Sequence, residues 1–256
     1  MIGFEFVGAF SCQHILSFPC CGRQDATEVN VAATRTILQQ CERAKTVRRV
    51  IHTGSVVVAS PLKEDGQGFK DFVDESCWTP LNLSYGYSNE LLDVYVSSKV
   101  LSEKELLSYN ESPSKAFEVV TLLCGLVAGD TLLPDAPISI RSVVSPLTGD
   151  ETYQNALRFM QALLGAVPLA HVDDVCEAHA FCMECPSPVG SSAPPATPTC
   201  ATSWITTGAS TRSSSCRSKR EGVRVRPGTD TSKLVDMGFK YRYGVEEVLD
   251  GSVECS

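Results

Sequence analysis

Tyr95 and Lys99 are the residues of this sequence whose types and spacing most clearly suggest chemistry. They form a Tyr-x-x-x-Lys pair in a segment with helical periodicity, and four residues along a helix place two side chains on one face. An ammonium group beside a phenol favours the phenolate, which makes a tyrosine useful for proton transfer. Such a pair often occurs by chance, so its place in the fold has to decide its meaning.

Ser55 gives the pair a place in the fold. It ends the β-branched run Arg49–Ser55, which is typical of a buried strand of a parallel sheet. Ligands of open α/β sheets bind beyond the carboxyl ends of the strands, so a hydroxyl there could hydrogen-bond a substrate oxygen. A serine at a strand end is usually a simple turn residue. Only its combination with Tyr95 and Lys99 on the following helix predicts a catalytic set.

The elements that hold these residues follow one another as strand, helix and strand. A helix capped by Ser88 runs to about Asn110, and the apolar strand Phe117–Leu123 precedes a turn over Cys124–Asp130. This βαβ order implies a parallel sheet with right-handed crossovers. The expected fold class is α/β, an incomplete Rossmann-type, doubly wound parallel sheet with a small C-terminal substrate-binding region.

Further elements are expected on both sides of this unit. A helix from about Asp25 to Cys41 ends in a basic run, which we interpret as solvated. That run comprises Arg43, Lys45, Arg48 and Arg49. The later patterns predict helix Tyr153–Leu164, strand Val167–His171, helix Val172–Cys182, strand Val223–Val225 and a helix from Val245.

Several motifs are informative in combination. They are Arg48–Ser55, Asp74–Trp78, Tyr95–Lys99, Cys124–Val127, His171–His179, Lys233–Lys240 and Gly244–Glu247. Together they resemble the extended short-chain dehydrogenase/reductases of plants, in particular the anthocyanidin reductase and dihydroflavonol 4-reductase group. This group is part of the NAD-dependent epimerase/dehydratase superfamily.

The resemblance implies NADPH-dependent reduction of a small flavonoid-like substrate, with NADH not excluded. It implies that Tyr95 donates the proton, that Lys99 assists it and binds the nicotinamide ribose, and that Ser55 orients the substrate oxygen. Thr53, Leu123 and Cys124 would lie against the cofactor. Leu123 stands where the family usually has proline, and Thr53 is followed by glycine where serine is commoner.

The glycine-rich loop of such reductases has no counterpart in the sequence. Family members bind the pyrophosphate at a Gly-x-x-Gly-x-x-Gly turn before a helix, whereas the early glycines here are Gly3, Gly8 and Gly22. We therefore expect an N-terminally truncated relative that begins near the fourth strand of the family fold and binds dinucleotide poorly. The alternative function is a catalytically silent homologue without the phosphate site.

Four parts of the chain are expected. Residues 1–24 are unplaced, and residues 25–150 form a partial dinucleotide-binding domain with the catalytic set. Residues 151–185 and 221–256 form a substrate-side region. The segment 186–220 is rich in Ser, Thr and Pro and contains no Leu, Asp or Glu, which predicts disorder. An out-of-frame reading over about 190–220 is the favoured hypothesis, because a shift of one base permits a string typical of these reductases.

Charge and cysteine content limit the other functions. A net charge of −8 gives no excess of basic residues to bind nucleic acid or anionic membranes, and no apolar run is long enough to span a membrane. Cysteines number 12 at irregular spacing, and Cys41, Cys124 and Cys176 lie in apolar segments that predict burial. Reduced thiols and a cytoplasmic location are expected, and the oligomeric state is left open.

A zinc site is the competing hypothesis from another class. Two imidazoles and a Cys-x-x-Cys occur close together at His171, His179, Cys182 and Cys185. The cysteines fall on a continuing helix rather than in a knuckle, so the sequence favours no metal site.

Overall fold

The structure, a computed structural model, describes residues 6–8, 23–70, 72–73, 77–184, 199–200, 203–205, 228–229 and 232–255. The interpretations of residues 9–22 and of strand Val223–Val225 lie outside these ranges. So does most of the Ser/Thr/Pro segment, of which two short strands are described.

The described helices and strands alternate along most of the chain. The helices are α1 (Arg23–Ala44), α2 (Glu90–Glu111), α3 (Ile138–Thr148), α4 (Glu151–Leu164), α5 (Val172–Glu184), α6 (Ser232–Asp236) and α7 (Val245–Glu254), with a 3₁₀ turn, η2 (Val56–Val58). The strands are β1 (Phe6–Gly8), β2 (Arg49–Ser55), β3 (Phe72–Val73), β4 (Glu118–Cys124), β5 (Leu126–Ala128), β6 (Val167–His171), β7 (Thr199–Cys200), β8 (Ser203–Ile205) and β9 (Gly228–Thr229). Within the described ranges, no helix is both long and apolar enough to cross a membrane.

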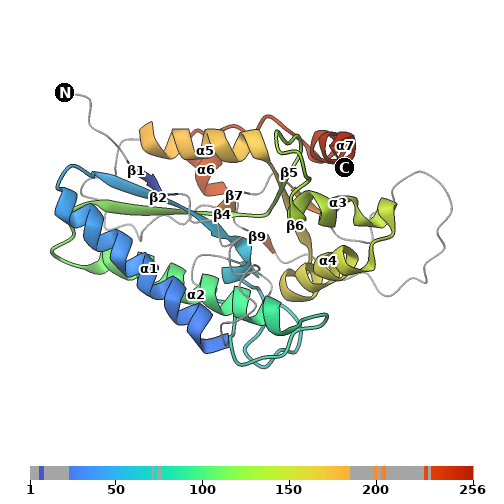
Figure 1. The fold of residues 1–256 in the computed structure, drawn as a ribbon, viewed down its shortest axis with the longest axis horizontal. Helices are drawn as coiled ribbons and strands as arrows, with labels where there is room; N and C mark the ends of the chain where they lie inside the picture. Colours follow the sequence, from blue (N-terminus) through green and yellow to red (C-terminus); the bar gives the residue numbers. More distant parts are fainter. Residues whose placement is uncertain are drawn as a thin grey trace.

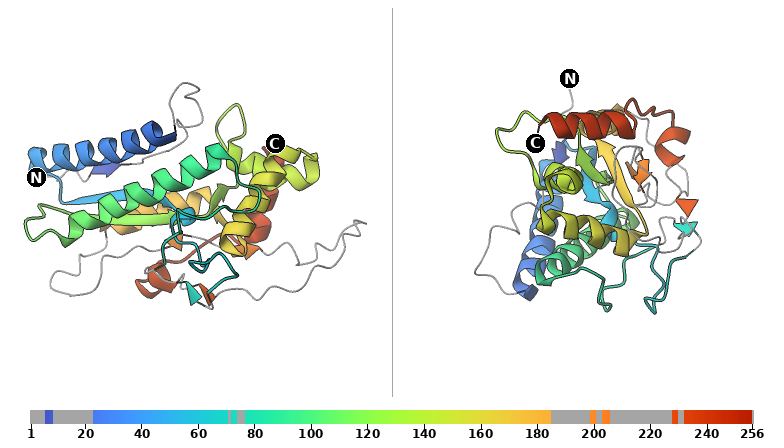
Figure 2. Two further views of the ribbon diagram at one scale, coloured as in Figure 1. Left: turned by 90° about the horizontal axis from the view of Figure 1, so that it is seen from below. Right: turned by 90° about the vertical axis from the view of Figure 1, so that its right-hand side faces the viewer.

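The main sheet is parallel and has the strand order β1-β2-β4-β7. Helices α1 and α2 cover one face and α5 covers the other (Figure 1), and Figure 2 shows α1 and α2 side by side. The chain leaves β2, forms α2 and returns as β4 parallel to β2. The predicted α/β, doubly wound parallel arrangement is confirmed.

Sequence alternation assigns the two faces of β2 and β4. Val50 of β2 and Val119 of β4 pack with α1 and α2, whereas Ile51 and Leu122 pack with α5. Because successive side chains of a strand point to opposite faces, each strand contributes to both layers. β4 (EVVTLLC) is therefore almost fully apolar, as a strand covered on two faces should be. β2 (RVIHTGS) departs from this pattern because it carries Arg49, His52 and Thr53.

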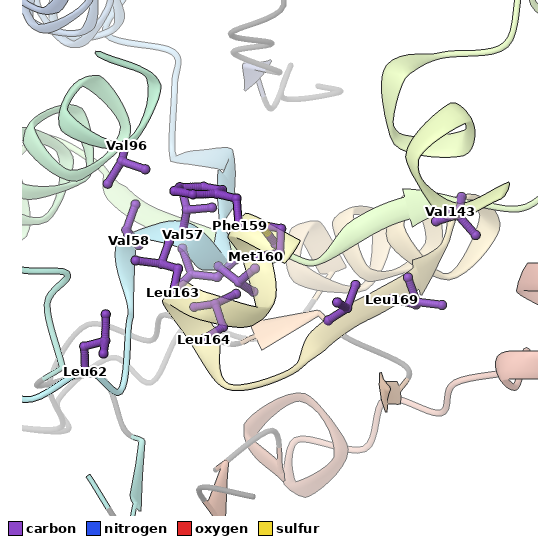
Figure 3. Packing of buried hydrophobic residues seen from close by; sticks show 14 of the residues in the cluster. Val57, Val58, Leu62, Val96, Val143, Phe159, Met160, Leu163, Leu164 and Leu169 are labelled. Carbon is purple, nitrogen blue, oxygen red and sulfur yellow. The ribbon is translucent and has the colours of Figure 1, made fainter. Parts of the chain in front are cut away.

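A second small sheet, β5-β6-β8, lies beside α3, α4 and α7. One apolar cluster joins these elements to the main sheet (Figure 3). It contains Val57 of η2, Val96 of α2 and Phe159 and Leu163 of α4, all at most 2% exposed. The C-terminal elements are thus packed directly against the turn that follows β2.

Two local predictions are wrong. Asn89, not Ser88, caps α2: its side chain accepts a hydrogen bond from the Leu92 amide at 3.0 Å, while the Ser88 hydroxyl donates to Asp93. The expected turn after β4 contains β5, which pairs in parallel with β6. Helix α3 is not among the predicted elements; it contains Pro146, and a proline inside a helix usually kinks or breaks it.

Arg49 is not solvated, contrary to the interpretation of the basic run. It is 8% exposed and lies in β2. Its guanidinium group donates to Glu118 of β4 at 2.9 Å and to the carbonyl oxygen of Cys182 in α5. A buried guanidinium needs such partners, so Arg49 joins two strands and a helix.

The cysteine expectation holds at two of three positions. Cys41 and Cys124 are buried free thiols, whereas Cys176 is exposed. Cys176 lies one position after Val175, which faces the sheet, so the helical period turns it outward.

Asp174 of α5 binds the segment that precedes α7. It is 0% exposed, and its carboxylate accepts hydrogen bonds from the backbone amides of Arg242 at 2.9 Å and Tyr243 at 3.3 Å. The Tyr243 ring stacks on His171 with centroids 3.7 Å apart.

We expect Asp174→Ala to lower the free energy of unfolding by about 2–4 kcal/mol, because two backbone amides lose a buried acceptor. Urea unfolding followed by circular dichroism measures this. Asp173→Ala is the matched control, because Asp173 has a side chain that is 56% exposed, and its loss should be below about 1 kcal/mol. Equal losses of unfolding free energy in the two variants would show that the hydrogen bonds of Asp174 stabilise the fold no more than an exposed carboxylate does.

Candidate active site

The carboxyl ends of β2 and β4 meet at one edge of the main sheet. Ser55 is the last residue of β2 and pairs in register with Cys124, the last residue of β4. The Ser55 hydroxyl accepts a hydrogen bond from the Val57 amide at 3.4 Å and so caps η2. This long bond uses the oxygen as acceptor and leaves the O–H group as a donor.

Helix α2 presents Tyr95 and Lys99 one turn apart on the side that faces the sheet. The Lys99 Nζ atom lies 6.0 Å from the centroid of the Tyr95 ring. Tyr95 is half-buried and packs against the apolar cluster that contains Val57 and Val58. Tyr95 thus packs on the same apolar cluster as the η2 turn that Ser55 caps, and Lys99 lies next to Tyr95.

Thr53 lies on the other face of β2. Its hydroxyl is 2.7 Å from Nε2 of His179 in α5, and Nδ1 of that imidazole is 2.7 Å from the Val175 carbonyl oxygen. Thr53 thus joins β2 to α5 and is not gathered with Tyr95.

Leu123 and Cys124 end β4 and are each 4% exposed. Leu123 packs in the cluster under α2 and Cys124 in the cluster under α5. Their backbone ends the strand at the edge where Ser55 lies, but their side chains belong to the core.

A buried polar group that the sequence reasoning missed lies below Lys99. Glu103 of α2 is 1% exposed, and its Oε2 atom is 3.6 Å from Nε2 of His52 in β2. His52 pairs in register with Thr121 of β4, which is also buried. Glu103 follows Lys99 by four residues, so helical periodicity could have placed it on the same face.

Burial and charge control how these groups ionise. Burial raises the pKa of Glu103 to about 7, although the nearby Thr121 hydroxyl and the charge of Lys99 act in the opposite direction. Burial, aided by the charges of Lys99 and His179, lowers the pKa of His52 to about 3. His52 is therefore neutral at physiological pH, and Glu103 can gain or lose a proton there.

Gly54 allows Glu103 to come this close to the sheet. A Cβ atom at position 54 would lie 2.8 Å from Cδ2 of Leu123, 3.2 Å from Oε2 of Glu103 and 3.4 Å from the Leu122 carbonyl oxygen. A serine here would have to displace these groups. The glycine at this position thus belongs with the buried carboxyl group.

The residues of the zinc hypothesis are not gathered in the described part of the chain. His171 stacks on Tyr243, whereas His179 contacts Thr53 and Cys182 is a residue of α5 that packs in the cluster between this helix and the sheet. Cys185 lies outside the described residues. Among those that are described, no three His, Cys, Asp or Glu side chains form a group that could hold a metal ion.

The donor set fits one end of a nicotinamide dinucleotide. The Ser55 and Tyr95 hydroxyls and the Lys99 ammonium group are the types of donor that a ribose and a carbonyl oxygen require. The described residues contain no glycine-rich turn leading into a helix, so contacts to the pyrophosphate are not assigned to them.

Comparison with known proteins decides the lineage. Residues 22–192 match the NAD dependent epimerase/dehydratase family. The chain belongs to this family. By lineage it is an NAD(P)-dependent oxidoreductase, and its cofactor class is a nicotinamide dinucleotide.

Plant reductases are among its similar proteins. The chain is 31% identical to a putative anthocyanidin reductase of Ginkgo biloba, over 90% of this chain and 67% of the relative. It is 32% identical to an anthocyanidin reductase, (2S)-flavan-3-ol-forming, of Vitis vinifera, over 90% and 68%. The resemblance inferred from the motifs is confirmed.

Solved structures show the same fold. Vestitone reductase from alfalfa superposes with a TM-score of 0.65 at 24% identity, covering 97% of this chain and 74% of that one. A yeast methylglyoxal/isovaleraldehyde reductase complexed with NADPH gives a TM-score of 0.61 at 17% identity, covering 97% and 74%.

Glu103 gives the protein a pH-dependent stability that can be measured. Because burial raises its pKa from 4.5 to about 7, the folded state binds the proton more tightly than the unfolded chain. The contribution is fully present below about pH 4.5 and is lost as the pH rises through about 7. His52 acts in the opposite sense, since its lowered pKa removes stability as the pH falls from 6.5 toward about 3.

We expect Glu103→Gln to gain stability relative to the wild type between about pH 5 and about pH 8, by up to roughly 3 kcal/mol. The measurement is the difference between the two free energies of unfolding at each pH, which cancels the effect of His52. Glu105→Gln, which removes a partly exposed carboxylate on the same helix, should give a nearly flat difference. A flat difference for Glu103→Gln as well would rule out the raised pKa.

Proposed function

We propose that this protein is an NADPH-dependent reductase of flavonoid-like compounds, of the anthocyanidin and dihydroflavonol type. The observation that carries the proposal is that Tyr95 packs on the apolar cluster that also contains the η2 turn capped by Ser55, with Lys99 6.0 Å from the Tyr95 ring. The anthocyanidin reductases and the vestitone reductase among its relatives support the substrate class.

Each residue of the set has a role in this reaction. With a carbonyl substrate such as a dihydroflavonol, a bound NADPH would supply the hydride, which adds to the carbonyl carbon as the C=O π bond breaks. The substrate oxygen takes its proton from the Tyr95 hydroxyl and becomes an alcohol. Lys99 stabilises the phenolate that Tyr95 leaves behind and binds the nicotinamide ribose, while Ser55 donates a hydrogen bond that orients the substrate oxygen.

The surroundings of the set have supporting roles in the proposal. The carboxyl ends of β2 and β4 would lie against the nicotinamide through the backbone of Thr53, Leu123 and Cys124. Residues 25–150 would hold the cofactor, and the substrate would bind toward 151–185 and 221–256, which supply α4 and α7. A cytoplasmic location, expected from reduced thiols, belongs to the same proposal.

One observation favours the alternative, a catalytically silent homologue. The sequence contains no Gly-x-x-Gly-x-x-Gly motif, and a helix terminus behind such a loop supplies oriented amides for the pyrophosphate. The two functions differ in a simple measurement, because the reductase must bind NADPH and the silent homologue does not.

We expect the purified protein to bind NADPH and to oxidise it in the presence of a dihydroflavonol, an anthocyanidin or an isoflavanone such as vestitone. Tyr95→Phe should lower kcat/KM by about 10²–10⁴-fold, because the proton donor is lost, while leaving the Kd for NADPH nearly unchanged. Stopped-flow absorbance at the NADPH band and fluorescence titration measure the two quantities.

Tyr109→Phe is the matched control. Tyr109 lies on α2 about 20 Å farther along the helix and stacks on Phe117, so this variant should keep full activity. Absence of NADPH binding in the wild type would establish the silent homologue. If the wild type binds NADPH and Tyr95→Phe keeps full activity, the proposed role of Tyr95 is wrong and the rest of the proposal stands.

A further inference from the structure

Tyr95, Lys99 and Glu103 form one line along the buried side of α2. They are spaced four residues apart, so each lies about one turn from the next. Lys99 is in the middle, with its Nζ atom 6.0 Å from the Tyr95 ring centroid, and its charge also acts on Glu103. The Lys99 ammonium group thus acts electrostatically on both neighbours.

The surroundings of Glu103 offer its carboxyl group little else. From β2, the neutral imidazole of His52 approaches to 3.6 Å and Gly54 leaves space, while β4 contributes the Thr121 hydroxyl. Neither carboxyl oxygen has a hydrogen-bond partner of ordinary geometry among the described residues. Lys99 is the cation that acts on this group.

Two charged residues of α1, Arg35 and Glu42, are engaged elsewhere. Arg35 forms an ion pair with Glu105 at 2.8 Å, and Glu42 accepts a hydrogen bond from Tyr109. His179, on the far face of β2, acts on His52 rather than on Glu103. The ionised carboxylate therefore finds its compensating charge in Lys99.

A buried carboxyl group at position 103 is energetically unfavourable. Burial without a full set of hydrogen bonds costs several kcal/mol, and an apolar side chain of similar volume would stabilise the helix packing better. A role in packing therefore does not explain Glu103, whereas its placement one turn beyond the lysine of the catalytic pair does.

We propose that Glu103 is a positioning residue that acts on Tyr95 through Lys99, an inference that rests on the proposed function. When its carboxyl group is ionised, it draws the Lys99 ammonium group toward itself and away from the Tyr95 phenol. When the carboxyl group is protonated, the ammonium group moves toward the phenol and favours the phenolate. Glu103 itself lies roughly 12 Å along the helix from Tyr95, so its direct effect on the phenol is small.

The ionisation of Glu103 falls in the range where the effect matters. Its pKa is raised to about 7 by burial, so the ammonium group is released to Tyr95 below about pH 7 and withdrawn above it. The charge that assists Tyr95 is thereby linked to pH within the physiological range.

The test follows the ionisation of the Tyr95 phenol in the full chain without NADPH or substrate. Protein labelled with ¹³C at tyrosine Cζ is titrated by NMR, and Tyr95→Phe assigns the resonance. In Glu103→Gln the midpoint of Tyr95 ionisation should fall by roughly one pH unit, because the lysine is no longer drawn away. Glu105→Gln, the matched control, should leave the midpoint in place.

A double-mutant cycle shows whether Lys99 is the intermediary. In a Lys99→Met background, Glu103→Gln should no longer move the midpoint. An unchanged or raised midpoint in Glu103→Gln, or the same fall in the Lys99→Met background, overturns the proposal. Should Glu103→Gln not fold, the ¹³Cε resonance of Lys99 in the wild type provides the test: an inflection near pH 7 supports the coupling, and its absence overturns it.

The outcomes separate this inference from the proposed function. A fall of the midpoint in a protein that does not reduce any carbonyl substrate supports the coupling and rejects the reductase. Activity that depends on Tyr95, together with a midpoint that does not fall, keeps the reductase and rejects the role of Glu103.

Discussion

The parallel pairing of β2 with β4 determines where every group of the candidate site lies. Its register sets Ser55 opposite Cys124 at the edge of the sheet, and His52 opposite Thr121 beneath α2. A slip of one residue would turn each side chain to the other face and would place the buried polar groups under α5. Arg49 resists such a slip, because its guanidinium group binds Glu118 of the neighbouring strand and a carbonyl group of α5 at once.

The buried polar side chains on the two faces of the main sheet differ in how completely they are hydrogen-bonded. On the α5 face, Thr53 and His179 satisfy each other, and the second imidazole nitrogen meets a backbone carbonyl group. On the α2 face, His52 and Glu103 are close but incompletely bonded. The first arrangement holds a helix to a sheet. The second arrangement carries a desolvation cost that packing alone does not offset. It lies beneath the helix that carries Tyr95 and Lys99.

Local sequence patterns predict most of the helices and strands but not the tertiary contacts between them. β2 was predictable because a β-branched run stops at Gly-Ser, and α2 because its apolar spacing is helical; its cap was misjudged because Ser88 and Asn89 are both good capping residues. β5 was missed because Gly125 and Gly129 read as a turn, although β6 pairs with the stretch between them. Glu103 has the appearance of a solvated helix residue. Its burial depends on Gly54 in a distant part of the sequence, and such a tertiary contact leaves no local pattern.

The apolar cluster of Figure 3 makes the Ser55 turn dependent on the C-terminal elements. Val57 and Val58 of η2 pack against Leu163 of α4, and the Ser60 hydroxyl donates to the Leu163 carbonyl oxygen at 2.5 Å. Tyr95 packs against the same cluster. Any displacement of α4 must therefore alter the packing of both the serine turn and the tyrosine, since close-packed cores transmit strain. A substrate held against α4 would thus be held against the same rigid body that carries its proposed hydrogen-bond donors, which is the condition for orienting a carbonyl oxygen toward them.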